Sequence, residues 1–300
     1  MRKSILILGV VVASLGLSAC DSSTTATIDT SIASLGAQSD LQIHFTASAS
    51  GPGTAETQKV LNVTSMDVRY ASTTGGPLSQ SNAKADSEVI LNVGTNQLLD
   101  VREIDSNFYV ELDLSAISAI PGLPLTTQEQ SQLAALQLVL GGKWFELTSS
   151  LIASEIPSSD AAQATATKER AIESKIVDAL SNLIDQGKAT SLASGGYSET
   201  GTLESVLLAI EPIIAPLDPS ASTAGPVKGT YTLTLTNAGS VATGGSISIT
   251  APEGSVSVGD ATVTLQAAVT HDNDSIATPT DVTVITPALI QQLLGSTSSL

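Results

Sequence analysis

Short runs in which apolar and polar residues alternate dominate both ends of this chain, and they constrain its fold more than any other feature. In FYVELDL, at positions 108–114, every second residue from Phe108 is apolar, and Glu111 and Asp113 lie between them. Such a period of two predicts a strand with one covered face and one wet face, an arrangement that antiparallel sheets allow.

The same period predicts further strands before and after the middle of the chain. They are expected at 41–48, 87–93, 97–104, 143–147, 231–235, 246–249, 255–258, 261–269 and 281–285. The run 59–70 is also rich in β-branched residues, but its apolar face changes parity between Val63 and Met66, which predicts a bulged strand. The glycine pairs 195–196 and 244–245 and the polar run 272–274 are expected to form turns.

Helical patterns take over in the middle of the chain, between these two groups of strands. Helices are expected at 126–140, 168–186 and 202–213, and a short last one at 288–294. The order of strands, helices and strands favours an α+β fold with one antiparallel sheet and its helices segregated to one side. We expect 39–114 and 229–286 to form one continuous sheet in a domain over 39–295, with a helical insertion at about 157–226.

The N-terminus carries the pattern of a secretory signal. A basic pair, Arg2 and Lys3, precedes an apolar run, and small residues lead to Cys20, the only cysteine. The run Leu-Ser-Ala-Cys resembles the lipobox of bacterial lipoproteins, which implies cleavage after residue 19 and a lipid on the Cys20 thiol. Residues 20–38 are small and polar and are expected to form a flexible tether. A buried or reactive cysteine is the alternative.

Charge narrows the partners of the mature chain. The net charge is −17, and removal of residues 1–19 takes away two basic residues and no acid, so it becomes −19. Nucleic-acid affinity depends on Lys and Arg that displace counterions, so the chain is not expected to bind nucleic acid. Anionic headgroups would repel it too, so we expect membrane attachment through the covalent lipid, on the extracytoplasmic side.

Few residues suggest chemistry at a catalytic or metal site. The two histidines, His44 and His271, are far apart in sequence, and we expect them on polar surfaces instead of in a zinc site. The run 271–275 is rich in oxygen ligands but lacks the glycine and the glutamate of a calcium loop. No nucleophile elbow is present to support a catalytic triad. We therefore expect no enzymatic activity, no metal and no cofactor.

The layout also resembles the LppX/LprA/LprF/LprG family of actinobacterial lipoproteins. The resembling pieces are the lipobox, DLQIHF, LNVTSMDVRY, LLDVREIDSNFYVELDL, GGKWFEL and VTLQAAVTHDNDSIATPTDVTVITP. The resemblance implies a half-barrel, a single curved antiparallel sheet with helices on its concave side. It also implies a cavity that carries the acyl chains of a lipid or glycolipid, with an envelope transporter as a partner. The long helical region and the acidic charge depart from the family, so the size of the cavity and its ligand stay open. The lipoprotein carrier and receptor of Gram-negative bacteria have a similar half-barrel, which makes lipoprotein trafficking an alternative function.

Eight apolar strand residues are candidates for the cavity lining. They are Ile43, Phe45, Val110, Leu112, Leu233, Leu235, Val263 and Leu265. A chain of about sixteen carbons needs on the order of 12 kcal/mol of apolar contact to leave a bilayer, which such faces could supply. The same faces could instead close as a dry core, which would favour a structural lipoprotein of the cell surface without a small ligand.

Overall fold

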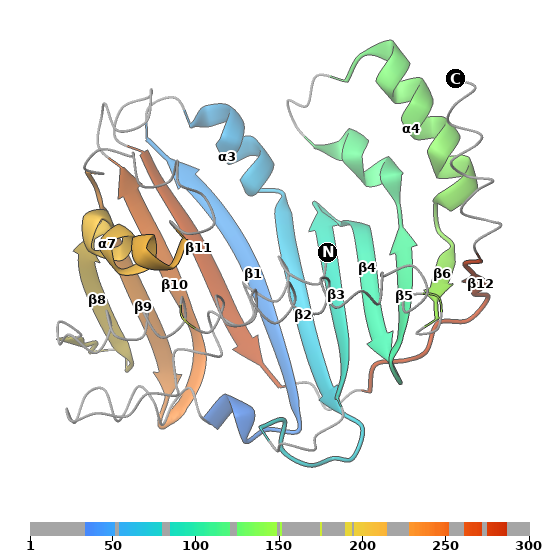
Figure 1. Ribbon diagram of the computed structural model, residues 1–300. Helices are drawn as coiled ribbons and strands as arrows, with labels where there is room; N and C mark the ends of the chain where they lie inside the picture. Colours follow the sequence, from blue (N-terminus) through green and yellow to red (C-terminus); the bar gives the residue numbers. More distant parts are fainter. Residues whose placement is uncertain are drawn as a thin grey trace.

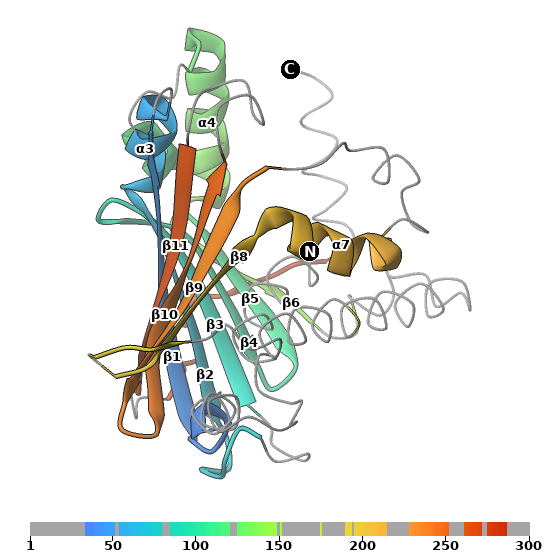
Figure 2. The same ribbon diagram turned by 90° about the vertical axis from the view of Figure 1, so that its left-hand side faces the viewer.

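A computed structural model shows one open, curved sheet of twelve strands with few helices (Figures 1 and 2). The structure describes residues 34–51, 54–79, 85–120, 125–148, 151, 175, 190–193, 195–214, 228–251, 261–271 and 275–286. The order of the strands across the sheet is β12-β6-β5-β4-β3-β2-β1-β11-β10-β9-β8-β7. The expected curved sheet is confirmed at this level.

The strands come from both ends of the chain. Their bounds are β1 Asp40–Ser50, β2 Thr64–Ser72, β3 Ala85–Val93, β4 Asn96–Ile104, β5 Asn107–Leu112, β6 Trp144–Leu147, β7 Thr190–Ser191, β8 Tyr197–Thr202, β9 Thr230–Ala238, β10 Val241–Ala251, β11 Ala261–Thr270 and β12 Thr283–Val284. The first group joins the last group where β1 pairs with β11, from Gln42 opposite Thr270 to Ser50 opposite Thr262. This pairing confirms that 39–114 and 229–286 share one sheet.

One pair of strands departs from the expected antiparallel arrangement. β12 runs parallel to β6, with Thr283 opposite Phe145, whereas the other strand pairs in the described part are antiparallel. The sheet is therefore mixed, and the prediction of a wholly antiparallel sheet is wrong at this edge. β12 follows β11 in the chain but pairs with β6 at the other end of the sheet, so a long connection that includes residues 275–282 joins β11 to β12. A parallel pair needs a long connection of this kind.

The helices that accompany the sheet lie mostly at the ends of its strands. Those whose bounds are defined are α3 Ala55–Leu61, the 3-10 helix η1 Leu114–Ala119, α4 Thr127–Leu140 and α7 Leu203–Ile214, and residues 34–36 form a further helical turn before β1. α4 and α7 confirm the helices predicted at 126–140 and 202–213. The Thr126 hydroxyl accepts a hydrogen bond from the Glu129 amide, and the Glu129 carboxylate accepts one from the Thr126 amide, so a capping box starts α4.

The predicted bulged strand over 59–70 is wrong in its first half. α3 occupies residues 55–61 and β2 begins only at Thr64. The change of parity therefore marks the switch from a helical period to a strand period instead of a bulge. The sheet does carry register shifts, between Leu91 and Asn92 in β3 and between Ala242 and Gly244 in β10.

The two glycine pairs behave differently. Gly195 and Gly196 lie between β7 and β8 with φ of 87° and 97°, so the expected turn is confirmed. Gly244 and Gly245 lie inside β10, where the expected turn is wrong. A Cβ on Gly244 would stand 2.5 Å from the Ala267 carbonyl oxygen, and one on Gly245 would stand 2.6 Å from that of Thr234. The neighbouring strands approach so closely there that only glycine fits.

Several predicted segments lie outside the described residues. They are residues 1–19 with Cys20, most of the tether and of the insertion 157–226, the helices 168–186 and 288–294, the strand 255–258 and the turn 272–274. Among the helices that are described, none is long and apolar enough to cross a membrane.

Candidate functional site

All eight candidate cavity residues lie on the same face of the sheet. Directly opposed residues of antiparallel strands point to the same side of a sheet. The pairing of each strand with the next therefore shows which residues share a face across the whole sheet. Phe45 of β1 lies opposite Met66 of β2 and Ala267 of β11. Val110 of β5 lies opposite Val101 and Phe145.

We call this side the apolar face. Its apolar members are Leu41, Ile43, Phe45, Ala47, Ala49, Met66, Val68, Tyr70, Val89, Leu91, Val93, Leu99, Val101, Phe108, Val110, Leu112, Phe145, Leu147, Tyr197, Tyr231, Leu233, Leu235, Ile247, Ile249, Val263, Leu265, Ala267 and Val269. It is continuous from β6 to β8, across ten neighbouring strands.

Burial varies strongly along the apolar face. Ile43, Phe45 and Val68 form a buried cluster at its centre, and Leu265 packs against that cluster. Val110, Leu112, Leu233 and Leu235 are half-buried. In contrast, Ile249 and Val263, which lie opposite each other on β10 and β11, are 39% and 45% exposed. The face is therefore packed at β1 and β2 and open to solvent at Ile249 of β10 and Val263 of β11.

A polar pair stands at the β8 end of the apolar face. Glu199 of β8 is only 5% exposed, although it lies among apolar neighbours and directly opposite Leu233. The Tyr231 hydroxyl donates a hydrogen bond of 2.9 Å to Glu199 Oε1. The pKa of Tyr231 is raised to about 12, mainly by burial and also by the hydrogen bond to Glu199 and by the charge of Glu199. The phenol therefore keeps its proton at neutral pH.

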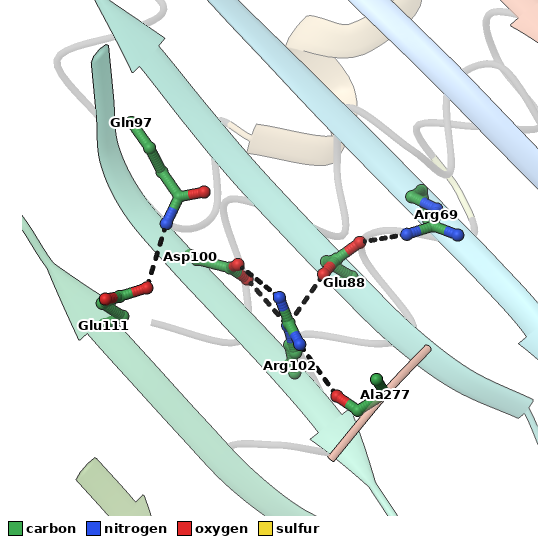
Figure 3. Close-up of polar contacts among 7 residues, drawn as sticks. All are labelled: Arg69, Glu88, Gln97, Asp100, Arg102, Glu111 and Ala277. Carbon is green, nitrogen blue, oxygen red and sulfur yellow. Dashed lines mark hydrogen bonds and ion pairs between the residues drawn. The ribbon is translucent and has the colours of Figure 1, made fainter. Parts of the chain in front are cut away.

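The opposite side, which we call the polar face, carries an ion-pair network across β2, β3 and β4 (Figure 3). Glu88 accepts from Arg69 Nη1 at 2.7 Å and from Arg102 Nε at 2.7 Å. Arg102 Nη2 also donates to Asp100 Oδ2 at 2.9 Å. Burial raises the pKa of Asp100, and the hydrogen bond and charge of Arg102 oppose that shift.

Residues 275–282 pass over the polar face and cover part of this network. Arg102 Nη1 donates to the Ala277 carbonyl at 2.8 Å, as Figure 3 shows. Ile276 is buried against Ile104 and Tyr109. The Arg102 guanidinium carbon also lies 4.6 Å from the centre of the Trp144 ring, within the range of a cation–π contact. This segment adds a small apolar cluster to an otherwise polar face.

The remainder of the polar face is rich in hydroxyl and amide groups. Thr200 and Thr232, Ser248 and Thr264, and Thr250 and Thr262 form cross-strand hydroxyl pairs at 3.2, 2.9 and 2.9 Å. Such pairs each contribute a fraction of a kcal/mol to strand pairing. They stabilise β8 to β11 without any apolar burial on this side.

Both histidines have structural partners. His44 lies on the polar face, as expected, and its Nδ1 is 2.7 Å from Asp67 Oδ1, while Asn92 donates to the other oxygen of Asp67. His271 Nδ1 lies 3.2 Å from the Asp40 carbonyl oxygen. Within the described ranges, no group of three or more His, Cys, Asp or Glu residues is arranged to hold a metal ion.

Sequence reasoning missed the Glu199–Tyr231 pair and the Arg–Glu network. The alternation in β3 and β4 did place Glu88, Asp100 and Arg102 on one side of their strands. It gave no sign that these charges would be buried. β8 itself, YSETGT, has no apolar alternation and gives no strand signal.

Comparison with known protein families and with curated protein sequences found no match to this chain. The fold and the faces therefore define its class directly. It is an open-sheet protein with one apolar face and one polar, ion-paired face.

Proposed function

We propose that this protein is a cell-envelope lipoprotein that binds or carries a lipid or an acylated glycolipid on its apolar face. The observation that carries the proposal is the exposed pair of Ile249 and Val263 within a continuous apolar face. Exposed apolar side chains in a contiguous patch are typical of binding surfaces. A membrane lipid offers acyl chains that match such a face, because each buried CH₂ contributes about 0.8 kcal/mol.

We further propose that helices cover this face and complete a half-barrel. α7 lies in front of β9 and β10 in Figure 1 and projects from the sheet in Figure 2. It starts directly after β8, and the Leu203 amide donates to the Gly229 carbonyl just before β9. An acyl chain between α7 and β10 would be shielded from water on two sides.

The second candidate is a structural lipoprotein whose sheet packs a filled core and binds no small ligand. The buried cluster of Ile43, Phe45 and Val68 favours it, since the centre of the apolar face is already packed. The two candidates differ at β10 and β11. A ligand-binding face needs apolar side chains that a ligand can reach, and a filled core does not.

Substitution of Val263 by glutamate tests the proposed lipid binding. We expect native mass spectrometry of wild-type protein from a lipid-containing host to show bound lipid, and the variant to lose it at least tenfold. An ionised group among acyl chains is costly to desolvate. Because Val263 is 45% exposed, the charge should leave the melting temperature nearly unchanged.

The matched control is Gln266→Glu on the same strand. Gln266 is exposed on the polar face, so the same charge there should leave lipid binding intact. A wild-type protein that carries no lipid from any host would contradict lipid binding and favour the structural candidate. Unfolding of Val263→Glu would show instead that this part of the face is a packed interior.

We also propose that Cys20 bears the membrane anchor, with the protein on the extracytoplasmic side of the cell membrane. The support is the sequence around Cys20 alone. We expect the wild-type protein to enter the detergent phase in Triton X-114 partitioning and Cys20→Ser to stay in the aqueous phase or remain uncleaved. A variant that partitions like the wild type would refute the anchor.

A further inference from the structure

We propose that the C-terminal half of α4 is a membrane-docking surface, whose exposed apolar side chains enter the boundary between the headgroups and the acyl chains of the bilayer. This inference goes beyond lipid binding on the apolar face of the sheet. It rests on the proposed anchor at Cys20, which holds the chain at the membrane. It concerns residues 133–140.

α4 is packed on one side only. Leu133, Gln137 and Leu140 share one face of the helix by their spacing, and all three are half-buried. The Gln137 amide fixes this face, because its oxygen accepts from the Leu114 amide at 2.6 Å and its nitrogen donates to Asp113 Oδ1 at 2.7 Å. Among the described elements η1 is the main partner of α4, and Figures 1 and 2 show the helix beyond the end of β5. No residue of α4 is fully buried.

The opposite side of this half of α4 is apolar and exposed. Leu138 is 82% exposed, and Leu136, Val139, Ala134 and Ala135 are exposed as well. Leu138 and Val139 follow Ala134 and Ala135 by four residues, so these side chains form one continuous surface. We call these five residues the α4 patch. A helical segment that is apolar all round is normally buried in a protein core or in a membrane.

The α4 patch also lies in an uncharged stretch of an acidic chain. No charged residue occurs from Gln130 to Gly142, although the sequence has 29 acidic residues. The nearest charge after the helix is basic, since Lys143 Nζ donates to the Val139 carbonyl at 3.0 Å. Acidic side chains would be repelled by anionic headgroups and would be costly to place among acyl chains. The patch therefore meets the requirement for contact with a bilayer, which most of this acidic surface does not.

The size of the α4 patch favours a membrane over a protein partner. Eight helical residues are about 12 Å long and about 10 Å wide, so the patch covers on the order of 120 Å². A stable protein interface buries about 800 Å² on each partner. A second copy of the chain would also bring its own net charge of −17. A bilayer needs no such area, because the lipid anchor supplies the attachment and the helix only orients the domain.

Quenching of an introduced tryptophan by brominated lipid tests this inference. Wild-type protein and Leu138→Trp are reconstituted through the anchor into phosphatidylcholine vesicles, either plain or brominated on the acyl chains. Trp144 is the only native tryptophan, so the difference from wild type is the signal of the added ring. We expect bromination to lower this signal at least about twofold, since interfacial helices bury their apolar side chains about 5–10 Å deep.

Matched variants show whether the quenching belongs to the α4 patch. Gln266→Trp places the ring on the polar face of β11, six strands or about 29 Å from β6, and should be quenched no more than Trp144. In the Leu138→Trp protein, Ala135→Glu adds a charge inside the patch and should remove most of the quenching. Gln128→Glu adds the same charge two turns earlier on the same side of α4 and should leave the quenching unchanged. Ala135 and Gln128 are both exposed, so neither change should unfold the protein.

Flotation of the same vesicles separates this inference from the anchor on which it rests. Protein that floats with the vesicles but shows no quenching in Leu138→Trp, or equal quenching with Ala135→Glu and Gln128→Glu, overturns the docking and leaves the anchor in place. Protein that does not float overturns the anchor, and the docking with it. An unquenched tryptophan together with a dimer that Ala135→Glu dissociates would assign the α4 patch to a second copy of the chain instead.

Discussion

Replacement of Glu88 by glutamine is expected to lower the free energy of unfolding by about 3 kcal/mol, within the range for a broken buried ion pair. Glu88 is 2% exposed and lies between two arginines whose side chains are only 20% and 19% exposed. Glutamine keeps the shape, but it places an amide donor against guanidinium donors and leaves Arg69 without its bond to this carboxylate. Arg102 would retain Asp100.

Urea denaturation followed by circular dichroism measures this loss, and Glu56→Gln is its control. Glu56 pairs with Lys59 at 2.7 Å on the surface of α3, with both side chains mostly exposed. Exposed pairs contribute about 0.5 kcal/mol or less, so the control should hardly change the midpoint. If Glu88→Gln cost no more than Glu56→Gln, the network on the polar face would not contribute to stability.

The sheet could be predicted from the sequence because half-buried strands record their burial in a period of two. β3, β4 and β5 follow this rule closely and are joined by two-residue turns, so their positions and partners were predictable. β1 and β11 lie far apart in the sequence, but both show the same alternation. Their pairing closes the central part of the sheet.

The predictions of secondary structure failed in segments whose local sequence pattern is weak or ambiguous. α3 has seven residues, too few for a helical period to emerge before β2 begins. On the apolar face β8 carries Glu199 and Gly201 beside a single apolar residue, Tyr197, so its sequence shows no apolar alternation. The parallel edge of β12 depends on the long path of residues 275–282, and no local pattern determines such a path.

The sequence could predict which residues of the candidate site share one face of the sheet, but it could not predict which of them are exposed to solvent. Alternation assigned Phe45 and Val263 to the same side of the sheet, and the register confirms it. Exposure depends on what each neighbouring strand and helix covers, which alternation does not encode. The structure separates the two residues, since Phe45 is buried and Val263 is open to solvent.

Replacement of Phe45 by alanine is therefore expected to lower the free energy of unfolding by about 3 to 4 kcal/mol, while Val263→Ala should cost less than about 1 kcal/mol. Phe45 is 3% exposed and belongs to the central cluster, against which Met66, Leu265 and Ala267 pack, so truncation leaves a cavity there. Val263 already contacts solvent, so little apolar area returns to water. Urea denaturation of both variants gives the two values.

The difference between these two costs bears directly on function. A large difference means that the apolar face is packed at its centre and free at Ile249 and Val263, where a ligand can add apolar contact without displacing any side chain. Equal and large costs would show that other parts of the chain fill the whole face. In that case lipid has no surface to bind, and the filled core of a structural lipoprotein becomes the better account of the chain.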